Sequence, residues 1–387
     1  MTTPESPRRN EGIDLLRGLS ILLVVVHHLG LRIPLRTSAV ATIVPRRLLD
    51  ALIHNGYEAV FIFFVISGFL IATNTLRRWG RLGSIEAGAF YARRLARIGP
   101  CLVALVLVLS VLHLAGATDY VITRANQSLT RAVVSALALH LNWYEGQTGY
   151  LPGNWDVLWS LSIEELFYLG FPALCLILRR DRVLVPVLLV LALSLPAARA
   201  AAAANEIWQE KAYLPGMAAI AAGVLGALFA QRFAPGRAIA NALCFVGLIG
   251  TAMVLLIEDI LWPLLGDGTI LLLTASTVAL VVGSHWRESD RAGRSPAAGT
   301  WLSSCGRLSY EIYLTHMFVV YSAVRLFRVG GGDVKFGFLW YVPVVALSWV
   351  LGQVIATFFS IPTERALRSV LLRRMHGAED PAGAVNQ

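Results

Sequence analysis

The first apolar stretch of the chain, LLRGLSILLVVVHHLG at residues 15–30, contains one arginine and two histidines. Charged and titratable groups are costly inside a membrane, and those retained there are commonly functional. Arg17 and His28 are three helical turns and about 20° apart, so a helix carries both on one face, about 16 Å from each other. Asp14 falls near this face, whereas His27 points a quarter-turn away. The face therefore combines a cation that can bind an anion with an imidazole that can move a proton.

Each of these residues also has a purely structural interpretation. Arg17 lies near the start of the stretch and could extend its guanidinium to the membrane interface. His28 could be a packing residue with satisfied hydrogen bonds or a member of a proton path, and His27 is better explained by helix packing. These residues together favour a functional role but do not specify a reaction.

A polar stripe follows in the stretch WSLSIEELFY at 159–168. Ser160, Glu164 and Tyr168 are four residues apart in succession, so they share one side of a helix. Glu164 could accept a hydrogen bond from His28, or it could be a carboxylate favoured by the positive end of the helix dipole. For the neighbouring Glu165 the dipole interpretation is preferred.

Two further stretches carry groups that suit a bound ligand. In RRLARIGP at 93–100, Arg93 and Arg97 share a helix face, and guanidinium groups bind phosphate in a bidentate manner. The alternative is an ordinary basic cytoplasmic loop. Ser67 and Gly68 fall in an apolar run, where a glycine permits close approach of a ligand or of another helix.

The composition indicates the solvent in which these residues must work. Of the 387 residues, 56% are hydrophobic and 15% are charged, and the mean hydropathy is +0.64. Soluble domains contain about 25% charged residues, so the chain is predicted to be a polytopic membrane protein. The net charge is +9. In a membrane protein an excess of basic residues usually marks the cytoplasmic loops, so nucleic acid is not an expected partner. The four cysteines show no disulfide or metal-ligand spacing.

Ten apolar runs approach the roughly 20 residues that a span requires. The run 130–143 is too short and contains His140, so we expect it to be re-entrant or interfacial. With both termini cytoplasmic, most arginines fall on the cytoplasmic side, as the positive-inside rule demands. The expected fold is an all-α membrane bundle over 13–358, with a disordered cytoplasmic tail at 1–12 and an amphipathic or disordered cytoplasmic tail at 359–387. The predicted spans are 13–31, 57–75, 100–117, 159–178, 183–199, 213–230, 238–257, 268–284, 307–326 and 338–358.

Arginine, ten residues and then histidine in a first span resembles the signature of acyltransferase family 3. This family comprises integral-membrane O-acyltransferases of bacterial surface glycans and some natural products. The resemblance continues through five motifs that stand in the family's order and cover nearly the whole chain. They are FFVISGFLI at 63–71, RRLARIGP at 93–100, WSLSIEELFYLGFP at 159–172, LSYEIYLTH at 308–316 and IPTERALR at 361–368.

The resemblance implies transfer of an acyl group, commonly acetyl, from cytoplasmic acyl-CoA to a hydroxyl of a carbohydrate, such as a surface polysaccharide or glycolipid. Acyl-CoA is then a co-substrate, and no tightly bound cofactor or metal is expected. Arg17 would contact CoA phosphate, and His28, neutral in an apolar site, would be the general base, with Glu164 as a second catalytic residue. The other candidates for CoA contact are Arg93, Arg94, Arg97 and Ser67, and those for acceptor contact are Trp159, Ser160, Tyr168, Tyr313, His316 and Glu364, of which His316 is the second choice for acid–base work.

The chain also departs from the family pattern. Relatives often have an acid two residues before the FFV run, where this chain has Phe61, and Glu58 one turn earlier could substitute. Many relatives carry an outer esterase-like SGNH domain, so we expect either direct transfer by this polypeptide or transfer through a separate periplasmic partner. The implied location is the bacterial inner membrane, among membrane lipids.

Two other functions compete with this prediction. The acceptor could be a small secreted product such as a macrolide sugar. Alternatively, the chain could be a proton-coupled transporter or flippase in which Arg17, His28 and Glu164 form a proton relay. A transporter would not consume acyl-CoA, so thioester turnover discriminates between the two classes.

Overall fold

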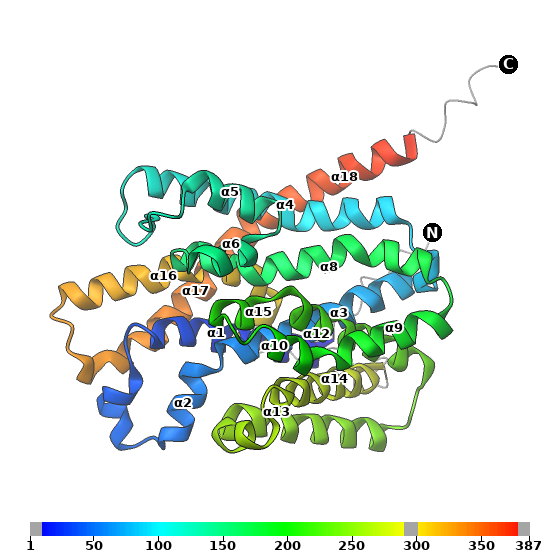
Figure 1. Cartoon of the computed structure of the whole chain (residues 1–387), viewed down its shortest axis with the longest axis horizontal. Coiled ribbons are helices and arrows are strands. Elements are labelled where there is room, and N and C mark those ends of the chain that lie inside the picture. The colour runs from blue at the N-terminus through cyan, green and yellow to red at the C-terminus, as the bar shows by residue number, and fades with distance from the viewer. Residues whose placement is uncertain (1–9, 290–300, 378–387) are drawn as a thin grey trace.

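A computed structural model describes residues 10–289 and 301–377, and none of these residues lies in a strand. Most long helices run along a common direction (Figure 1). We call the end of the bundle at which α1 begins the proximal end, and the end at which α1 finishes the distal end. The α-helices are α1 (Glu11–Gly30), α2 (Arg46–His54), α3 (Gly56–Trp79), α4 (Ala87–Leu114), α5 (Leu129–Leu137), α6 (Leu141–Thr148), α7 (Gly153–Asp156), α8 (Leu158–Ile177), α9 (Asp181–Leu193), α10 (Leu195–Ala201), α11 (Glu206–Lys211), α12 (Tyr213–Arg232), α13 (Arg237–Leu265), α14 (Gly268–Ser289), α15 (Trp301–Arg307), α16 (Ser309–Val329), α17 (Tyr341–Ile355) and α18 (Ile361–Gly377).

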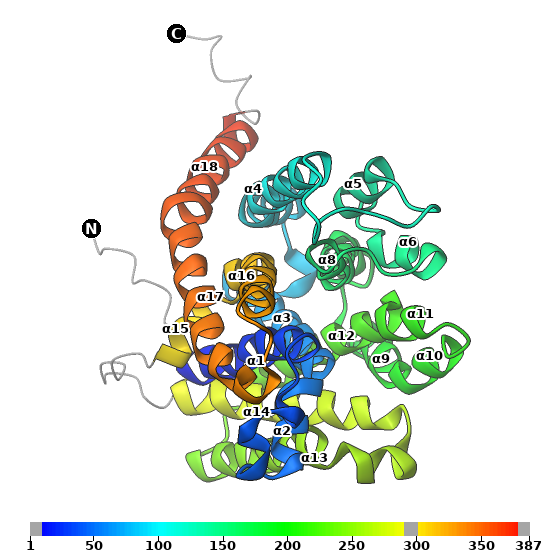
Figure 2. The same cartoon turned by 90° about the vertical axis from the view of Figure 1, so that its left-hand side faces the viewer.

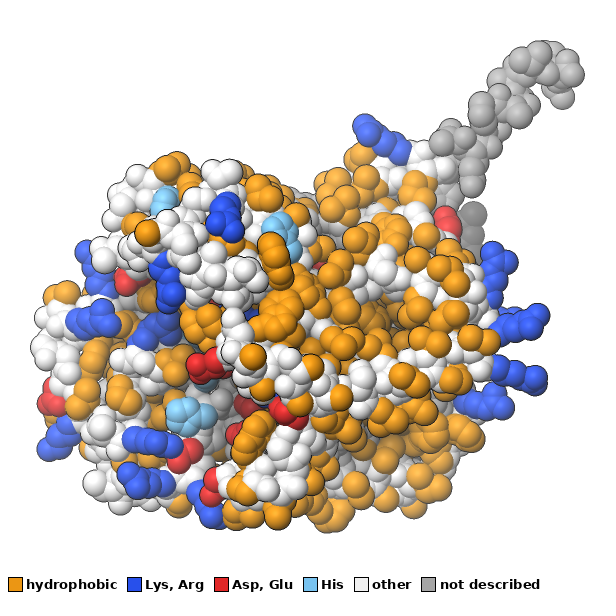
Figure 3. Space-filling view, in the orientation of Figure 1, with side chains coloured by type: hydrophobic (Ala, Val, Ile, Leu, Met, Phe, Trp, Pro, Cys, Tyr) orange, Lys and Arg blue, Asp and Glu red, His pale blue; other side chains and the backbone are white. Residues whose placement is uncertain are grey.

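The helices have the lengths and the surface of a membrane bundle. In the described part of the chain, nine helical segments are long and apolar enough to cross a membrane, or ten if α9 and α10 form one bent span. The prediction of about ten spans is therefore confirmed. Apolar side chains cover much of the surface (Figure 3), and Leu264 and Phe358 are 74% and 79% exposed. Apolar surface of this extent is suited to contact with lipid.

The predicted span at 183–199 corresponds to α9 and α10, which are bent by 45° relative to each other. Ser194 separates the two helices, and Pro196 follows at the start of α10. Proline has no backbone N–H to donate and its ring displaces the preceding turn, so a break at this point follows from the sequence.

The run 130–143 does not form a span. Its residues fall in α5 and α6, which have nine and eight residues. Between them Leu139 adopts a positive φ of 61°, which ends the helical path. The segment is thus a pair of short helices at the distal end, as the expectation of an interfacial segment required.

Helices α1, α3 and α16 lie at the centre of the bundle, as the view along its length shows (Figure 2). The backbones of α3 and α12 touch, because a Cβ atom at Gly68 would collide with the carbonyl oxygen of Ile220 and one at Gly223 with that of Val65. A glycine is needed at both positions for this approach. The contact fixes the height and rotation of Ser67, the neighbour of Gly68.

The C-terminal part is one continuous helical path. α17 passes through a π-helical segment, Ala356–Ser360, directly into α18. The domain boundary predicted between 358 and 359 falls inside this π-helical segment. Of the predicted tails, residues 1–9 and 378–387 lie outside the described residues.

Candidate active site

A cavity of about 370 Å³ lies between α1, α3, α4, α8 and α16. Most of the predicted site residues line this cavity, although they come from five different helices. The predicted residues at its walls are Arg17, Ser67, Arg94, Arg97, Ser160, Glu164, Tyr168 and Tyr313. His28, Arg93, Trp159, His316 and Glu364 are not among the lining residues.

Arg17 is held at the cavity wall by a contact between the first and the sixteenth helix. Its Nη2 donates a hydrogen bond of 2.8 Å to the hydroxyl oxygen of Ser309 at the start of α16. A guanidinium has five N–H donors, so this bond uses a small part of its capacity. The start of α1 is itself fixed by Asn10, whose side chain accepts a hydrogen bond from Ile13. Arg17 is therefore oriented by its surroundings rather than free to extend to the interface.

Arg94 and the polar stripe of α8 form one network. Arg94 pairs with Glu165 at 2.8 Å, and its guanidinium carbon lies 3.7 Å from the centre of the Tyr168 ring. The Tyr168 hydroxyl donates to Glu164 at 2.7 Å, and the Ser67 hydroxyl contacts both. The preferred interpretation of Glu165 was wrong: it lies beyond the first turn of α8 and is an ion-pair partner of Arg94.

Glu364 links α18 to the cavity wall. It accepts a hydrogen bond of 3.1 Å from Arg97 and lies 3.5 Å from Arg368. Arg97 also lies near the ring of Tyr310, a further lining residue. Glu364 thus contacts a cavity arginine and does not line the cavity itself.

Histidines lie beyond the distal wall of the cavity. The Tyr313 hydroxyl donates to the Val157 carbonyl at 2.8 Å and is 2.7 Å from the hydroxyl of Ser160. The His316 ring lies 5.9 Å from the Tyr313 ring and 5.2 Å from the His28 ring. Ser160 and His316, both predicted for acceptor contact, therefore lie next to Tyr313 at the cavity wall, and the predicted base His28 lies next to His316.

Three other predicted or considered residues lie outside this group. Trp159 stacks on Tyr57 with ring centres 6.3 Å apart. His27 is hydrogen-bonded through Nδ1 to the Ile53 carbonyl at 2.6 Å, which agrees with a packing role. Glu58, considered as a substitute for the missing acid, is buried at the start of α3 and does not line the cavity.

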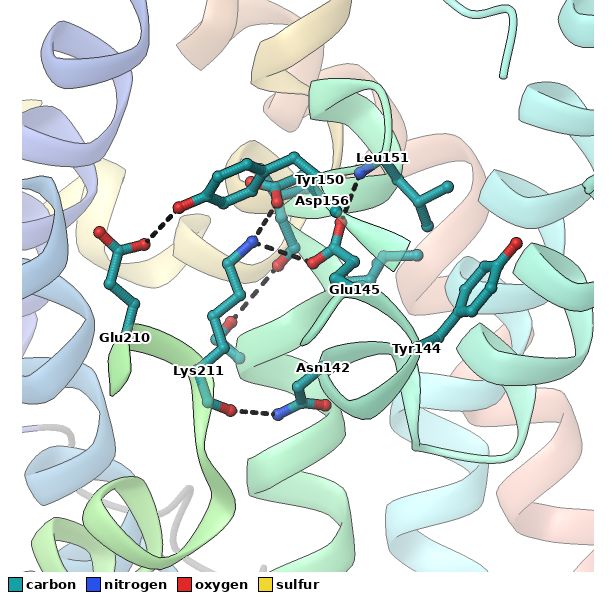
Figure 4. Close-up of polar contacts among 12 residues, drawn as sticks. Asn142, Tyr144, Glu145, Tyr150, Leu151, Asp156, Glu210 and Lys211 are labelled. Atoms are coloured by element: carbon teal, nitrogen blue, oxygen red, sulfur yellow. Dashed lines mark hydrogen bonds and ion pairs between the residues drawn. The ribbon is translucent and has the colours of Figure 1, made fainter. Parts of the chain in front are cut away.

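A second charged cluster at the distal end was not anticipated from the sequence (Figure 4). Lys211 pairs with Glu145 at 2.9 Å and also with Asp156, and the side chains of Lys211 and Glu145 are 3% and 0% exposed. Glu145 accepts a further hydrogen bond from the backbone N–H of Leu151. Burial raises the pKa of Glu145, the neighbouring Asp156 adds to this rise, and Lys211 opposes it. The one available signal was that Lys211 is one of only two lysines in the chain.

No metal site is found in the part of the chain that the structure describes, where no three His, Cys, Asp or Glu side chains are grouped closely enough to hold an ion. Guanidinium groups at the proximal part of the cavity can bind an anion, and the imidazoles beyond its distal wall can accept a proton.

A family model described as an acyltransferase domain matches residues 10–361. The chain belongs to acyltransferase family 3. O-acetyltransferase OatA of Staphylococcus aureus (strain NCTC 8325 / PS 47) is 28% identical over 178 residues, which are 43% of this chain and 25% of OatA. A protein of Staphylococcus aureus (strain COL) that is also named for O-acetyltransferase activity is 29% identical over 168 residues, 42% of this chain and 24% of its own length. No solved structure matches.

The family and the apolar helices together make the chain a multi-pass membrane acyltransferase. The similar segment covers about a quarter of the length of the curated relatives. Their complete activities therefore apply to this chain only as proposals.

Proposed function

We propose that this acyltransferase moves an acyl group, most simply acetyl, from acyl-CoA to a hydroxyl of a carbohydrate acceptor. The observation that carries the proposal is the composition of this cavity, which has Arg17, Arg94 and Arg97 at its walls and Tyr313 beside the His28–His316 pair. CoA combines phosphate groups with a long, narrow pantetheine arm. Arginines suit the phosphates, and a cavity between helices suits the arm.

The proximal end is proposed to face the cytoplasm, where acyl-CoA is made. Exposed arginines gather at the proximal ends of the spans. Arg77 and Arg78 are in the last turn of α3 and Arg81 follows it, and Arg179, Arg180 and Arg182 follow α8. The positive-inside rule favours this orientation, in a bacterial inner membrane. The acceptor would then approach from the distal end.

In the proposed reaction an imidazole next to the distal wall of the cavity removes the proton of the acceptor hydroxyl. The acceptor oxygen attacks the thioester carbonyl, a C–O bond forms and the C–S bond breaks. The CoA thiolate leaves with the proton that the imidazole took. Glu164 accepts hydrogen bonds from Ser67 and Tyr168, and these bonds hold the three polar side chains in place at the cavity wall.

The test is turnover of radiolabelled acetyl-CoA by protein purified into lipid nanodiscs, with glycans from cells that lack the gene as acceptor pool. We expect release of CoA and label in the glycan fraction, both abolished in heat-denatured protein. Wild-type protein that binds and consumes no acyl-CoA would contradict the proposal and favour the transporter function. Label in a small extractable product instead of glycan would change the acceptor class only.

A further inference from the structure

His316 holds one ring nitrogen in a fixed hydrogen bond and leaves the other without one. Its Nδ1 lies 2.7 Å from the carbonyl oxygen of Tyr313 and 3.2 Å from that of Ile312. The ring is fully buried, at 0% exposure, and among the described residues its Nε2 has no hydrogen-bond partner. Buried polar atoms are usually hydrogen-bonded, so an unpartnered one needs an explanation, of which a catalytic role is one.

The Nδ1 contacts determine which nitrogen carries the proton. Carbonyl oxygens only accept hydrogen bonds, so Nδ1 must be the donor and bear the hydrogen. In the neutral ring Nε2 is then the unprotonated nitrogen with a free lone pair. Because Nδ1 is turned to the backbone of its own helix, Nε2 is turned away from α16. This is how a backbone carbonyl orients an imidazole that acts as a base.

His316 lies next to a second histidine and to a residue of the cavity wall. The rings of His28 and Tyr313 lie 5.2 and 5.9 Å away, and Tyr313 is a lining residue of the cavity. The charged and titratable groups around the two histidines are Arg32, His27 and Lys211, of which Arg32 and Lys211 are cations. In the neutral His316 ring the lone pair of Nε2 is available to take a proton.

We propose that His316, through Nε2, is the group that takes the proton of the acceptor hydroxyl, and that His28 shares this proton. The inference rests on the proposed function and assigns a residue to its central step. The hydroxyl O–H bond breaks as Nε2–H forms, and the oxygen bonds to the thioester carbon as the C–S bond breaks. His28 accepts a hydrogen bond from the new Nε2–H and so stabilises the cation. The proton then leaves with the thiolate as CoA–SH, and both rings return to the neutral state.

The experiment uses water as a defined acceptor, because its O–H can take the place of the acceptor hydroxyl at the same base. Full-length protein in nanodiscs is given acetyl-CoA, and release of the CoA thiol is followed with a thiol reagent. His316→Ala should lower this rate by about 10²- to 10⁴-fold, the usual effect of losing a general base. Added imidazole should restore part of the rate in His316→Ala and none in wild type. Removing both histidines should cost little more than removing His316 alone, because residues that act as a unit are not additive.

Two variants separate a chemical role from a structural one. His316→Gln fills much of the same space without a basic nitrogen and should be as inactive as His316→Ala. His27→Ala removes a histidine that is also bonded to a carbonyl, and it should keep most of the activity. Acetyl-CoA affinity, measured by calorimetry, should be the same in all of these proteins. In wild type, kcat/KM should fall as the pH drops and the base becomes protonated.

Active wild type with a near-wild-type His316→Gln would overturn the assignment of the base and leave the proposed function intact. The same holds if His316→Ala is folded and inactive but gains nothing from imidazole at any concentration. Wild-type protein that binds no acyl-CoA and releases no CoA would overturn the proposed function together with this inference.

Discussion

The arginine-lined cavity and the distal Lys211 cluster both hold buried cations but differ in how these cations are paired. At the distal end Lys211 is surrounded by Glu145 and Asp156, both of which bind its ammonium group, and almost no side-chain surface is left open. At the cavity, Arg17 donates to a neutral serine, and Arg94 and Arg97 each face one carboxylate while lining about 370 Å³ of space. The distal cluster joins segments of the chain, whereas the cavity has guanidinium N–H donors along a wall that a ligand could contact.

This difference shows which buried charges in the molecule point to a ligand. Lys211 connects α11 to α6 and to the segment before α8, and Asn142 reinforces the same connection by donating to the Lys211 carbonyl at 2.8 Å. A buried charge that is fully paired holds parts of the structure together, and removing one partner leaves the other as an uncompensated buried charge. A guanidinium that has unused donors at a cavity wall can bind a phosphate without giving up a partner in the protein.

The largest expected effect concerns which end of the bundle faces the cytoplasm, because the proposed use of the cavity arginines depends on it. In a background without the four native cysteines, Arg81→Cys marks the proximal end and Thr118→Cys the distal end, and both positions are exposed. An impermeant maleimide added to intact cells should label Thr118→Cys and leave Arg81→Cys unlabelled until the cells are opened. Labelling in the reverse order would place the arginine-lined part of the cavity on the outside and exclude cytoplasmic acyl-CoA as its ligand.

Lys211→Met should unfold the protein more readily without changing the donor site. It leaves the buried Glu145 and the partly buried Asp156 with no cation, and breaking a buried ion pair typically costs about 3–5 kcal/mol. We expect a lower thermal unfolding midpoint in nanodiscs and less protein in the membrane, with unchanged acetyl-CoA affinity in the folded fraction. The matched control is Lys335→Met, because Lys335 is the other lysine and is exposed. Equal unfolding midpoints of the two variants would mean that the distal cluster does not stabilise the fold.

Arg17→Ala should weaken acetyl-CoA binding with little effect on stability, the reverse of Lys211→Met. Hydrogen bonds to charged groups contribute about 1.5–3 kcal/mol, so the Kd for acetyl-CoA should rise roughly 10- to 150-fold while the unfolding midpoint changes little. Arg17→Lys should recover only part of the affinity, since an ammonium cannot reproduce the planar fork. Arg77→Ala, an exposed arginine at the same end, serves as control. Calorimetry that finds equal affinity in wild type and Arg17→Ala would remove Arg17 from the donor site.

Ser67→Ala should give the smallest change. It removes the hydroxyl that contacts Glu164 and Tyr168, but the bond from Tyr168 to Glu164 remains. Because Tyr168 still donates to the Glu164 carboxylate, we expect a loss at the low end of the range for a charged acceptor, about 1.5 kcal/mol, so turnover should fall by roughly tenfold. Ser110→Ala in α4, where the hydroxyl donates to the Val106 carbonyl of its own helix, should leave turnover unchanged. A loss as large as that of His316→Ala would make Ser67 part of the chemistry rather than of the wall.

The sequence by itself determined the spans and the residues that share one helix face. A run of about 20 apolar residues and a repeat of 3.6 residues per turn are local properties, so the span count, the common face of Arg17 and His28 and the stripe of Ser160, Glu164 and Tyr168 could be predicted. The order of the family motifs identified the acyltransferase for the same reason, since each motif is a short local pattern.

Only the tertiary structure decided which helix faces meet. The pairing of Lys211 with Glu145 joins residues 66 apart, and that of Arg94 with Glu165 joins residues 71 apart. No periodicity within one helix fixes such a contact, because it depends on crossing angles and on the heights at which helices touch. The glycine contacts between α3 and α12 set one of these heights, and the bond from Arg17 to Ser309 sets another. The meeting of His28 with His316 follows from that packing, which is why the free nitrogen of His316 could be found only in three dimensions.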